Sequence, residues 1–281
     1  MIRLFLNQDF NSGGLVPDLE NIKRYFESKN KIIESFQYAD LNQLTGLNNW
    51  SSSGLVPCFV RCDLDFGGRF VSQLSLAPEN VRFNKIFDSL TFENGRWLPR
   101  LKYFDILRRK IVTQFGKIEI QESAGIICRA DACYGLVSVL VSLGFRNILL
   151  FLQETGQDVA EELGRYFIGV TIRVIPFSSL TQNQDLTSVM INAVDLESNS
   201  ALMSDIAYFN FMTPNGIIVD LVSKAPVHPL LFEADKAGLR TMKRRDVVAF
   251  YDYESLRQID PTVEKSKDDF LQNYLEIETI D

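Results

Sequence analysis

The segment from Cys128 to Cys133 combines the residue types that most invite a chemical interpretation. Two thiols, a guanidinium and a carboxylate stand between an apolar run and an apolar helical segment; the residues are Cys128, Arg129, Ala130, Asp131, Ala132 and Cys133. A turn that leads from a strand into a helix is a common phosphate site, because the first N–H groups of the helix point at the ligand. Here Asp131 places a negative charge where the phosphate would bind.

The elements around this turn predict a strand–helix–strand unit. Ile126 and Ile127 precede the turn, a helix is expected over Leu136–Leu143 with Gly144 closing it, and a second buried strand over Ile148–Leu152. In a dinucleotide-binding unit the turn carries glycines, so that the backbone can approach the pyrophosphate closely. No glycine stands in this turn. The pattern therefore predicts a dinucleotide-type scaffold whose cofactor site has been lost or has changed its ligand.

The composition narrows the classes of partner. The chain of 281 residues has a net charge of −7, which opposes binding to nucleic acid or to an anionic membrane surface. No apolar run reaches the roughly 20 residues of a membrane span. The four cysteines are too few for a disulfide framework, and Met1 opens no signal-peptide pattern, so a reducing cytoplasm is expected. Cys58, Cys62 and the single His228 fall short of a zinc site, which needs about four ligands.

Short strands alternate with helices in the first third of the chain. We expect a strand over Ile2–Leu6, a helix over Asp18–Ser28 with Asp18 as its N-cap, and a strand over Cys58–Leu64. Asn94-Gly95 predicts a hairpin between extended segments at 84–92 and 96–101. A helix over Tyr103–Phe115 then leads into a second domain.

The second domain continues the alternation. A helix is expected over Gln157–Phe167 and strands over 171–175, 188–193 and 216–221, a pattern typical of a parallel sheet with helices on both faces. The strand at Ile126 should lie at the sheet centre beside the strand at Ile148. The sequence thus predicts an α/β fold of two domains. One spans residues 1–101 and is completed by helices at 246–281, and the other spans 102–245.

Several segments resemble the shikimate/quinate dehydrogenase family over nearly the whole chain. The family's glycine-rich turn aligns with Cys128 onward, its I-N-A-T segment with Ile191 to Val194, and its D-x-x-Y-x-P-x-x-T-P-L-L segment with Asp220 to Leu231. The resemblance implies an N-terminal substrate domain, a C-terminal Rossmann-like domain and NADP-dependent hydride transfer. The family's N-R-T segment, whose arginine pairs with the 2′-phosphate of NADP, reads Leu152-Gln153-Glu154 here. Glu154 could bind a ribose hydroxyl or be a plain surface carboxylate.

The resemblance also indicates where the substrate machinery would lie. The catalytic lysine falls on Arg69 and the catalytic aspartate on Tyr103 or, after a shift of two residues, on Asp105. Arginine stays charged and cannot serve as the acid/base, but it can bind a carboxylate bidentately. Ser12 and Asn192 remain as supporting donors. The plainer interpretation makes Arg69 a solvated turn residue, and it makes Asp131 a helix N-cap.

These observations predict a catalytically degenerate protein, a pseudoenzyme, with neither NAD nor NADP as cofactor and no metal. Its cleft would bind a small anionic metabolite through Ser12, Arg69 and Asn192, or it would bind a protein partner. Two alternatives stay open. One is an active NAD(P)-dependent oxidoreductase with an altered cofactor turn, and the other is a regulatory or scaffold protein whose cleft is filled by side chains. A homodimer is compatible with each of them.

Overall fold

The computed structural model describes residues 2–7, 10, 14–39, 58–74, 76–93, 96–152, 157–182, 185–196, 209–222, 229–260 and 263. The chain forms two compact units. The N-terminal unit comprises residues 1–103 and 248–281, and the C-terminal unit comprises residues 104–247. The sequence placed these boundaries at 101 and 245. We describe each unit by itself.

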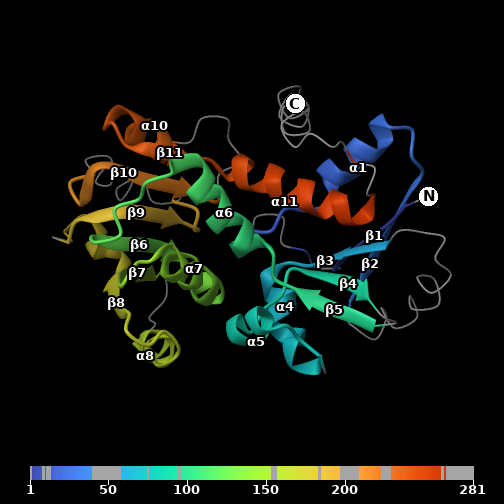
Figure 1. Cartoon of the computed structure of the whole chain (residues 1–281), viewed down its shortest axis with the longest axis horizontal. Coiled ribbons are helices and arrows are strands. Elements are labelled where there is room, and N and C mark those ends of the chain that lie inside the picture. The colour runs from blue at the N-terminus through green and yellow to red at the C-terminus, as the bar shows by residue number, and fades with distance from the viewer. Residues whose placement is uncertain are drawn as a thin grey trace. The chain divides into compact units, whose positions relative to one another are not determined.

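The N-terminal unit is built on a five-stranded mixed sheet of order β2-β1-β3-β4-β5 (Figure 1). β1 pairs in parallel with β2 and β3, whereas β3, β4 and β5 pair in antiparallel fashion. The strands are β1 (Ile2–Asn7), β2 (Ile33–Tyr38), β3 (Cys58–Arg61), β4 (Ser89–Glu93) and β5 (Arg96–Arg100). The expected hairpin is present as β4 and β5, whose register pairs Glu93 with Arg96. β2 had no counterpart among the expected elements.

Local side-chain bonds decide where the helices of this unit begin. The strand expected to reach Leu64 ends at Arg61, because the Asp63 side chain accepts from the Phe66 N–H at 2.7 Å and starts a helix. The expected N-cap at Asp18 is wrong by one residue: Leu19 holds that position, and Asp18 accepts from the Glu20 N–H. The helical elements are α1 (Glu20–Ser28), α4 (Leu64–Phe70), η1 (Val71–Gln73) and α5 (Glu79–Asn84).

The C-terminal unit has a six-stranded sheet of order β11-β10-β9-β6-β7-β8 (Figure 1). Every neighbouring pair in it is parallel, and the order reverses between β6 and β9, as in a doubly wound nucleotide-binding sheet. β6 lies near the centre beside β7, so the predicted fold class is confirmed. The strands are β6 (Ser123–Cys128), β7 (Asn147–Leu152), β8 (Thr171–Pro176), β9 (Thr187–Asn192), β10 (Met212–Asp220) and β11 (Arg240–Met242).

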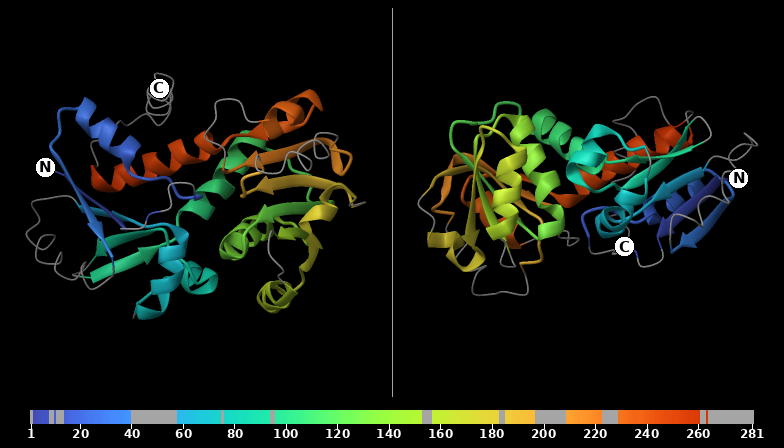
Figure 2. Two further views of the ribbon diagram at one scale, coloured as in Figure 1. Left: turned by 180° about the vertical axis from the view of Figure 1, so that it is seen from behind. Right: turned by 90° about the horizontal axis from the view of Figure 1, so that it is seen from below.

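Helices cover this sheet along its length. α7 packs on β6 and β7, α8 on β8, and α10 on β10 and β11 (Figure 2). Gly144 closes α7 in the left-handed conformation with φ 107°, as the sequence predicted. The helical elements that contribute to this unit are α6 (Tyr103–Phe115), α7 (Ala130–Leu143), α8 (Gln157–Tyr166), η2 (Phe177–Gln182), α10 (Pro229–Lys236) and the start of α11 (Arg244–Ile259).

The centre of the C-terminal sheet is buried on both faces. Every residue of β6 and β9 is buried, which is why these strands read as continuous rather than alternating patterns. Ile127, Phe151 and Met190 pack in one apolar cluster with Leu230 and Leu231 of α10. Within the described ranges, no helix is both long and apolar enough to cross a membrane.

Candidate functional site

The turn between β6 and α7 is shorter than the sequence indicated. β6 ends at Cys128 and α7 already begins at Ala130, so Arg129 is the N-cap, with an extended backbone and no side-chain cap hydrogen bond. The interpretation of Asp131 as the N-cap is therefore wrong, because the helix starts one residue before it. Asp131 is the second residue of α7. Its side chain and that of Ala130 lie outside the described part of the structure, whereas Arg129 is exposed.

Two thiols close the inner side of this turn. The Cys128 and Cys133 Sγ atoms are 3.1 Å apart, and the Cys133 thiol also donates to the Arg129 carbonyl at 3.3 Å. Both cysteines are completely buried. Ala132, the fifth residue of the predicted loop, lies in the first turn of α7 and is buried as well. The turn therefore presents a guanidinium to solvent and a pair of thiols to the interior.

Asn192 ends β9 and ties it to the neighbouring strand. Its Nδ2 donates to Asp220 Oδ1 at the end of β10 over 2.9 Å, and its carbonyl accepts from the Leu221 N–H. Both side chains are buried. These bonds give Asn192 a structural role in the C-terminal unit, and its predicted role as a substrate donor stays a prediction.

The N-terminal unit contains a buried ion pair that the sequence did not reveal. Arg61 at the end of β3 lies with its Nη1 2.9 Å from Asp252 Oδ1 of α11, and neither side chain is exposed. The guanidinium also donates to the Asp18 carbonyl at 2.6 Å and to Ser255 Oγ at 3.1 Å. It stacks over the Tyr251 ring, 4.7 Å from the centroid. These contacts compensate the guanidinium charge within the protein.

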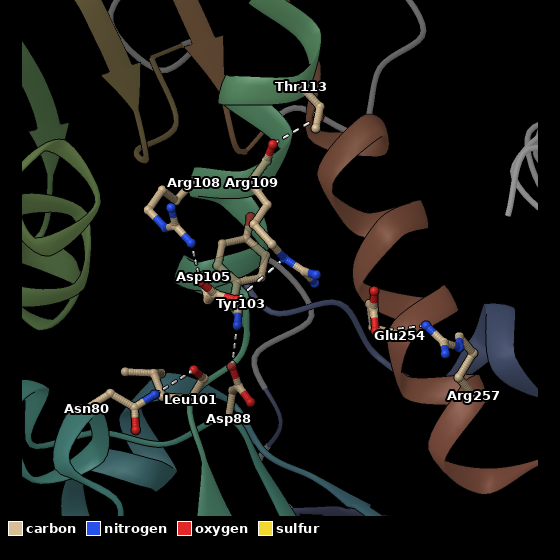
Figure 3. Close-up of polar contacts among 10 residues, drawn as sticks. All are labelled: Asn80, Asp88, Leu101, Tyr103, Asp105, Arg108, Arg109, Thr113, Glu254 and Arg257. Carbon is tan, nitrogen blue, oxygen red and sulfur yellow. Dashed lines mark hydrogen bonds and ion pairs between the residues drawn. The ribbon is translucent and has the colours of Figure 1, made fainter. Parts of the chain in front are cut away.

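Asp88, on the segment before β4, fixes the start of α6. Its Oδ2 accepts from the backbone N–H groups of Lys102 and Tyr103, each at 2.7 Å, and its Oδ1 accepts from Ser89 Oγ (Figure 3 shows the bond to Tyr103). Burial raises the pKa of Asp88, and the backbone N–H of Tyr103 is the strongest opposing influence. The carboxyl group therefore connects the hairpin to the beginning of the helix.

Lys102, the residue just before α6, has a pKa that is shifted toward neutral pH. Burial lowers its pKa from 10.5 to about 8, against the opposing attraction of Asp88. Its Nζ donates to Gln258 Oε1 of α11 and lies 5.8 Å from the centroid of the Phe59 ring. An amine that titrates in this range can transfer protons or hold an anion. The sequence analysis missed Lys102, because only the packing around it shows that it is half-buried.

The predicted substrate residues take part in local ion pairs. Arg69 lies inside α4 rather than on a turn, its side chain is 54% exposed, and its Nε is 3.3 Å from Asp65 Oδ2 one helical turn away. Asp105 is exposed in the first turn of α6 and pairs with Arg108 and Arg109 (Figure 3). Ser12, Glu154 and His228 fall outside the described residues.

The described residues offer no metal centre, since none of their His, Cys, Asp and Glu side chains form a group of three or more that could hold an ion.

Comparisons with known proteins identify the fold. No family model matches the chain, and no curated protein matches it. Shikimate 5-dehydrogenase from Thermus thermophilus, solved in complex with shikimate, superposes with a TM-score of 0.69 at 14% identity, covering 99% of this chain and 100% of its own. The enzyme from Listeria monocytogenes, in complex with shikimate and NAD, gives 0.73 at 11% identity and covers 98% and 96%. The 5-ketofructose reductase of a Gluconobacter strain gives 0.69 at 11% identity and covers 99% and 98%.

The chain thus has the two-domain α/β fold of the shikimate dehydrogenases over nearly its whole length. The resemblance predicted from the sequence is confirmed at the level of the fold. The reductase among these structures has a different substrate in its name, so the fold alone does not fix the substrate.

Proposed function

We propose that this protein does not carry out NAD(P)-dependent reduction and that it binds a small anionic metabolite in its N-terminal unit. The observation that carries the proposal is the β6–α7 turn. A dinucleotide site needs glycine at this turn for the backbone to approach the pyrophosphate. Here Arg129 is the N-cap and Asp131 stands in the first turn, where an acidic residue compensates the positive end of the helix dipole and opposes a phosphate.

Arg69 in the N-terminal unit also supports the absence of NAD(P)-dependent reduction, because it cannot act as the catalytic acid/base. Arg69 stands at the position that the resemblance gives to the catalytic lysine, and a guanidinium does not release its proton at physiological pH. Its head group contacts Asp65 on its own helix. Neither Arg69 nor this ion pair provides a group that could transfer a proton in the hydride-transfer reaction.

Lys102 is the better candidate for holding an anion. Because burial is the main cause of its lowered pKa, a bound carboxylate or phosphate would favour the charged amine and be favoured by it. Arg61, by comparison, is already compensated by Asp252. A protein partner, including a second copy of the chain, is the other class of ligand that this proposal leaves open.

A second candidate function is an active oxidoreductase acting on a shikimate-like hydroxy acid. The observation that favours it is again Lys102, since a pKa of about 8 suits a general acid/base near neutral pH. In that case the nucleotide would bind without the glycine-rich turn.

Calorimetry and thermal unfolding separate the two candidates. The purified chain is titrated with NAD and NADP at millimolar concentration, and its unfolding temperature is measured with a panel of small carboxylates that includes shikimate. We expect no nucleotide binding and a rise in unfolding temperature with at least one anion, because a ligand of the native state stabilises it. Lys102→Met should abolish that rise, whereas Lys29→Met, which changes an exposed lysine of the same unit, should not.

A micromolar dissociation constant for either nucleotide, together with its reduction in the presence of shikimate, would establish the second candidate. Absence of any anion effect would leave the N-terminal unit without its proposed ligand.

A further inference from the structure

Cys128 and Cys133 are two thiols in direct contact in the described part of the C-terminal unit. Their sulfur atoms are 3.1 Å apart, about 1 Å more than the bond length of a disulfide. Cys128 is the last residue of β6 and Cys133 lies in the first turns of α7. Two rigid elements therefore hold the thiols in contact, and a small shift of the helix start would bring them to bonding distance.

Packing alone does not require a contact between two sulfur atoms at this place. Two apolar side chains would fill the same volume without placing a thiol hydrogen between two sulfur atoms. Nor do the two thiols point to a metal ion, because no third His, Cys, Asp or Glu side chain joins them among the described residues and a structural zinc needs about four ligands.

We propose that Cys128 and Cys133 are a redox-active pair that closes to an intramolecular disulfide on exposure to a two-electron oxidant such as hydrogen peroxide. One thiolate attacks a peroxide oxygen and becomes a sulfenic acid while the other oxygen leaves as hydroxide and takes up a proton to form water. The second thiol then attacks the sulfenic sulfur, the S–S bond forms, and a second water leaves. In total two thiols lose two electrons and two protons, and one peroxide becomes two waters.

We expect the oxidant to reach the buried pair at the start of α7. The first N–H groups of a helix have no partner within the helix, and helix ends in general fray more readily than helix centres. The neighbouring Arg129 is exposed and marks the solvent side of the turn. Closing the bond would fix the first turn of α7 to the end of β6.

The sequence itself provides a direct assay. Trypsin cleaves after Lys117, Arg129 and Arg146, so Cys128 and Cys133 fall into two separate peptides, 118–129 and 130–146. The reduced full chain is exposed to increasing peroxide, blocked with N-ethylmaleimide and digested without reductant. We expect the two peptides to appear as one linked species, lighter by two hydrogens than their sum, and to separate when dithiothreitol is added.

Two variants control the assignment. Cys133→Ser keeps a donor for the Arg129 carbonyl and should remove the linked species. Cys62→Ser changes another buried cysteine, one whose thiol donates to the Phe87 carbonyl, and should retain it. The oxidised wild-type chain should also unfold at a higher temperature than the reduced chain, and this difference should be absent from Cys133→Ser.

The proposal is overturned if both thiols of the folded wild-type chain are still alkylated after peroxide treatment, or if Cys128 is found linked to Cys58 or Cys62 instead. Should Cys133→Ser not fold, the wild-type peptide map decides by itself. The outcome does not depend on the proposed function, since it is read from the covalent state of the chain and not from ligand binding.

Discussion

The two units of the protein differ in how their buried polar side chains are paired. The N-terminal unit places an arginine and two carboxylates, Arg61, Asp88 and Asp252, where none is exposed to solvent. In the C-terminal unit the middle of the sheet is apolar, and polar side chains such as Asn192 and Asp220 stand at the strand ends. The N-terminal unit thus buries a full ion pair between Arg61 and Asp252, whereas the buried strand ends of the C-terminal sheet are joined by the neutral amide of Asn192 and the carboxylate of Asp220.

The largest effect is expected from breaking the buried ion pair. Asp252→Asn preserves the shape of the side chain but removes the charge that Asp252 sets against the buried Arg61 guanidinium, so the free energy of unfolding should fall by about 3–5 kcal/mol. Urea unfolding measures the loss. Glu254→Gln on the same helix, whose carboxylate is 3.9 Å from Arg257 near the surface, is the matched control and should change little (Figure 3).

The double variant Arg61→Met with Asp252→Leu should recover most of the loss, because apolar side chains of similar volume need no charge compensation. If Asp252→Asn lowered the free energy of unfolding by less than roughly 1 kcal/mol, the N-terminal unit would not depend on its buried ion pair.

The corresponding change in the C-terminal unit should cost less. Asn192→Ala removes one neutral side chain and leaves Asp220 Oδ1 without this donor, so we expect a loss of about 1–3 kcal/mol in the free energy of unfolding. Asn147→Ala, at the exposed start of β7, is the control. A loss as large as that of Asp252→Asn would mean that the strand ends of this unit are as dependent on polar contacts as the N-terminal centre.

The burial of Lys102 should make the free energy of unfolding depend on pH. Its pKa is about 8 in the folded chain and 10.5 ordinarily, so below pH 8 both states carry the proton and the folded state bears the full cost of the buried charge. Between these values the unfolded state binds more protons, and wild-type stability rises with pH.

Lys102→Met removes that cost. The full shift in pKa corresponds to about 3 kcal/mol, and solvent screening of this half-buried amine reduces that figure. The variant should therefore be more stable than the wild type at neutral pH by about 1–2 kcal/mol, with the difference shrinking as the pH approaches 10.5. Denaturant unfolding at both ends of this range measures it. A difference that does not change with pH would assign the effect to packing.

The smallest effect is expected from Arg69. Its ion pair with Asp65 joins side chains that are 54% and 68% exposed, and such pairs contribute no more than about 0.5 kcal/mol. Arg69→Ala should leave both stability and anion binding nearly unchanged. If it abolished anion binding while Lys102→Met did not, the ligand site would lie at Arg69, where the sequence first placed it.

The spacing of apolar residues predicted an element correctly where the bounds of that element depend on its own sequence. The helix expected over Tyr103–Phe115 has those bounds in the structure, and Gly144 ends α7 as expected. The errors arose at the first residues of helices. Asp63 begins α4 and so shortens β3, and α7 begins before Asp131 because Arg129 takes the N-cap position. In both cases a single hydrogen bond or backbone angle, rather than a repeating pattern, decided the outcome.

The candidate site depended more strongly on contacts between distant segments. The resemblance pointed to Arg69 and Asp105, which the structure shows in exposed pairs within their own helices. Lys102 and Asp88 drew no attention, because a lysine before a helix and an aspartate before a strand are common in exposed loops. Their burial comes from the packing of α11 and the hairpin around them, which no local pattern records.

The sequence by itself determined the alternation of strands and helices, the parallel sheet of the C-terminal unit and the absence of glycine from its first turn. These follow from apolar spacing and from residue types, which act over a few neighbouring positions. Only the tertiary structure decided that Arg61 meets Asp252, that Lys102 loses water, and that two thiols come within 3.1 Å of each other. Each of these depends on burial and distance, and those are properties of the packed chain rather than of any segment in it.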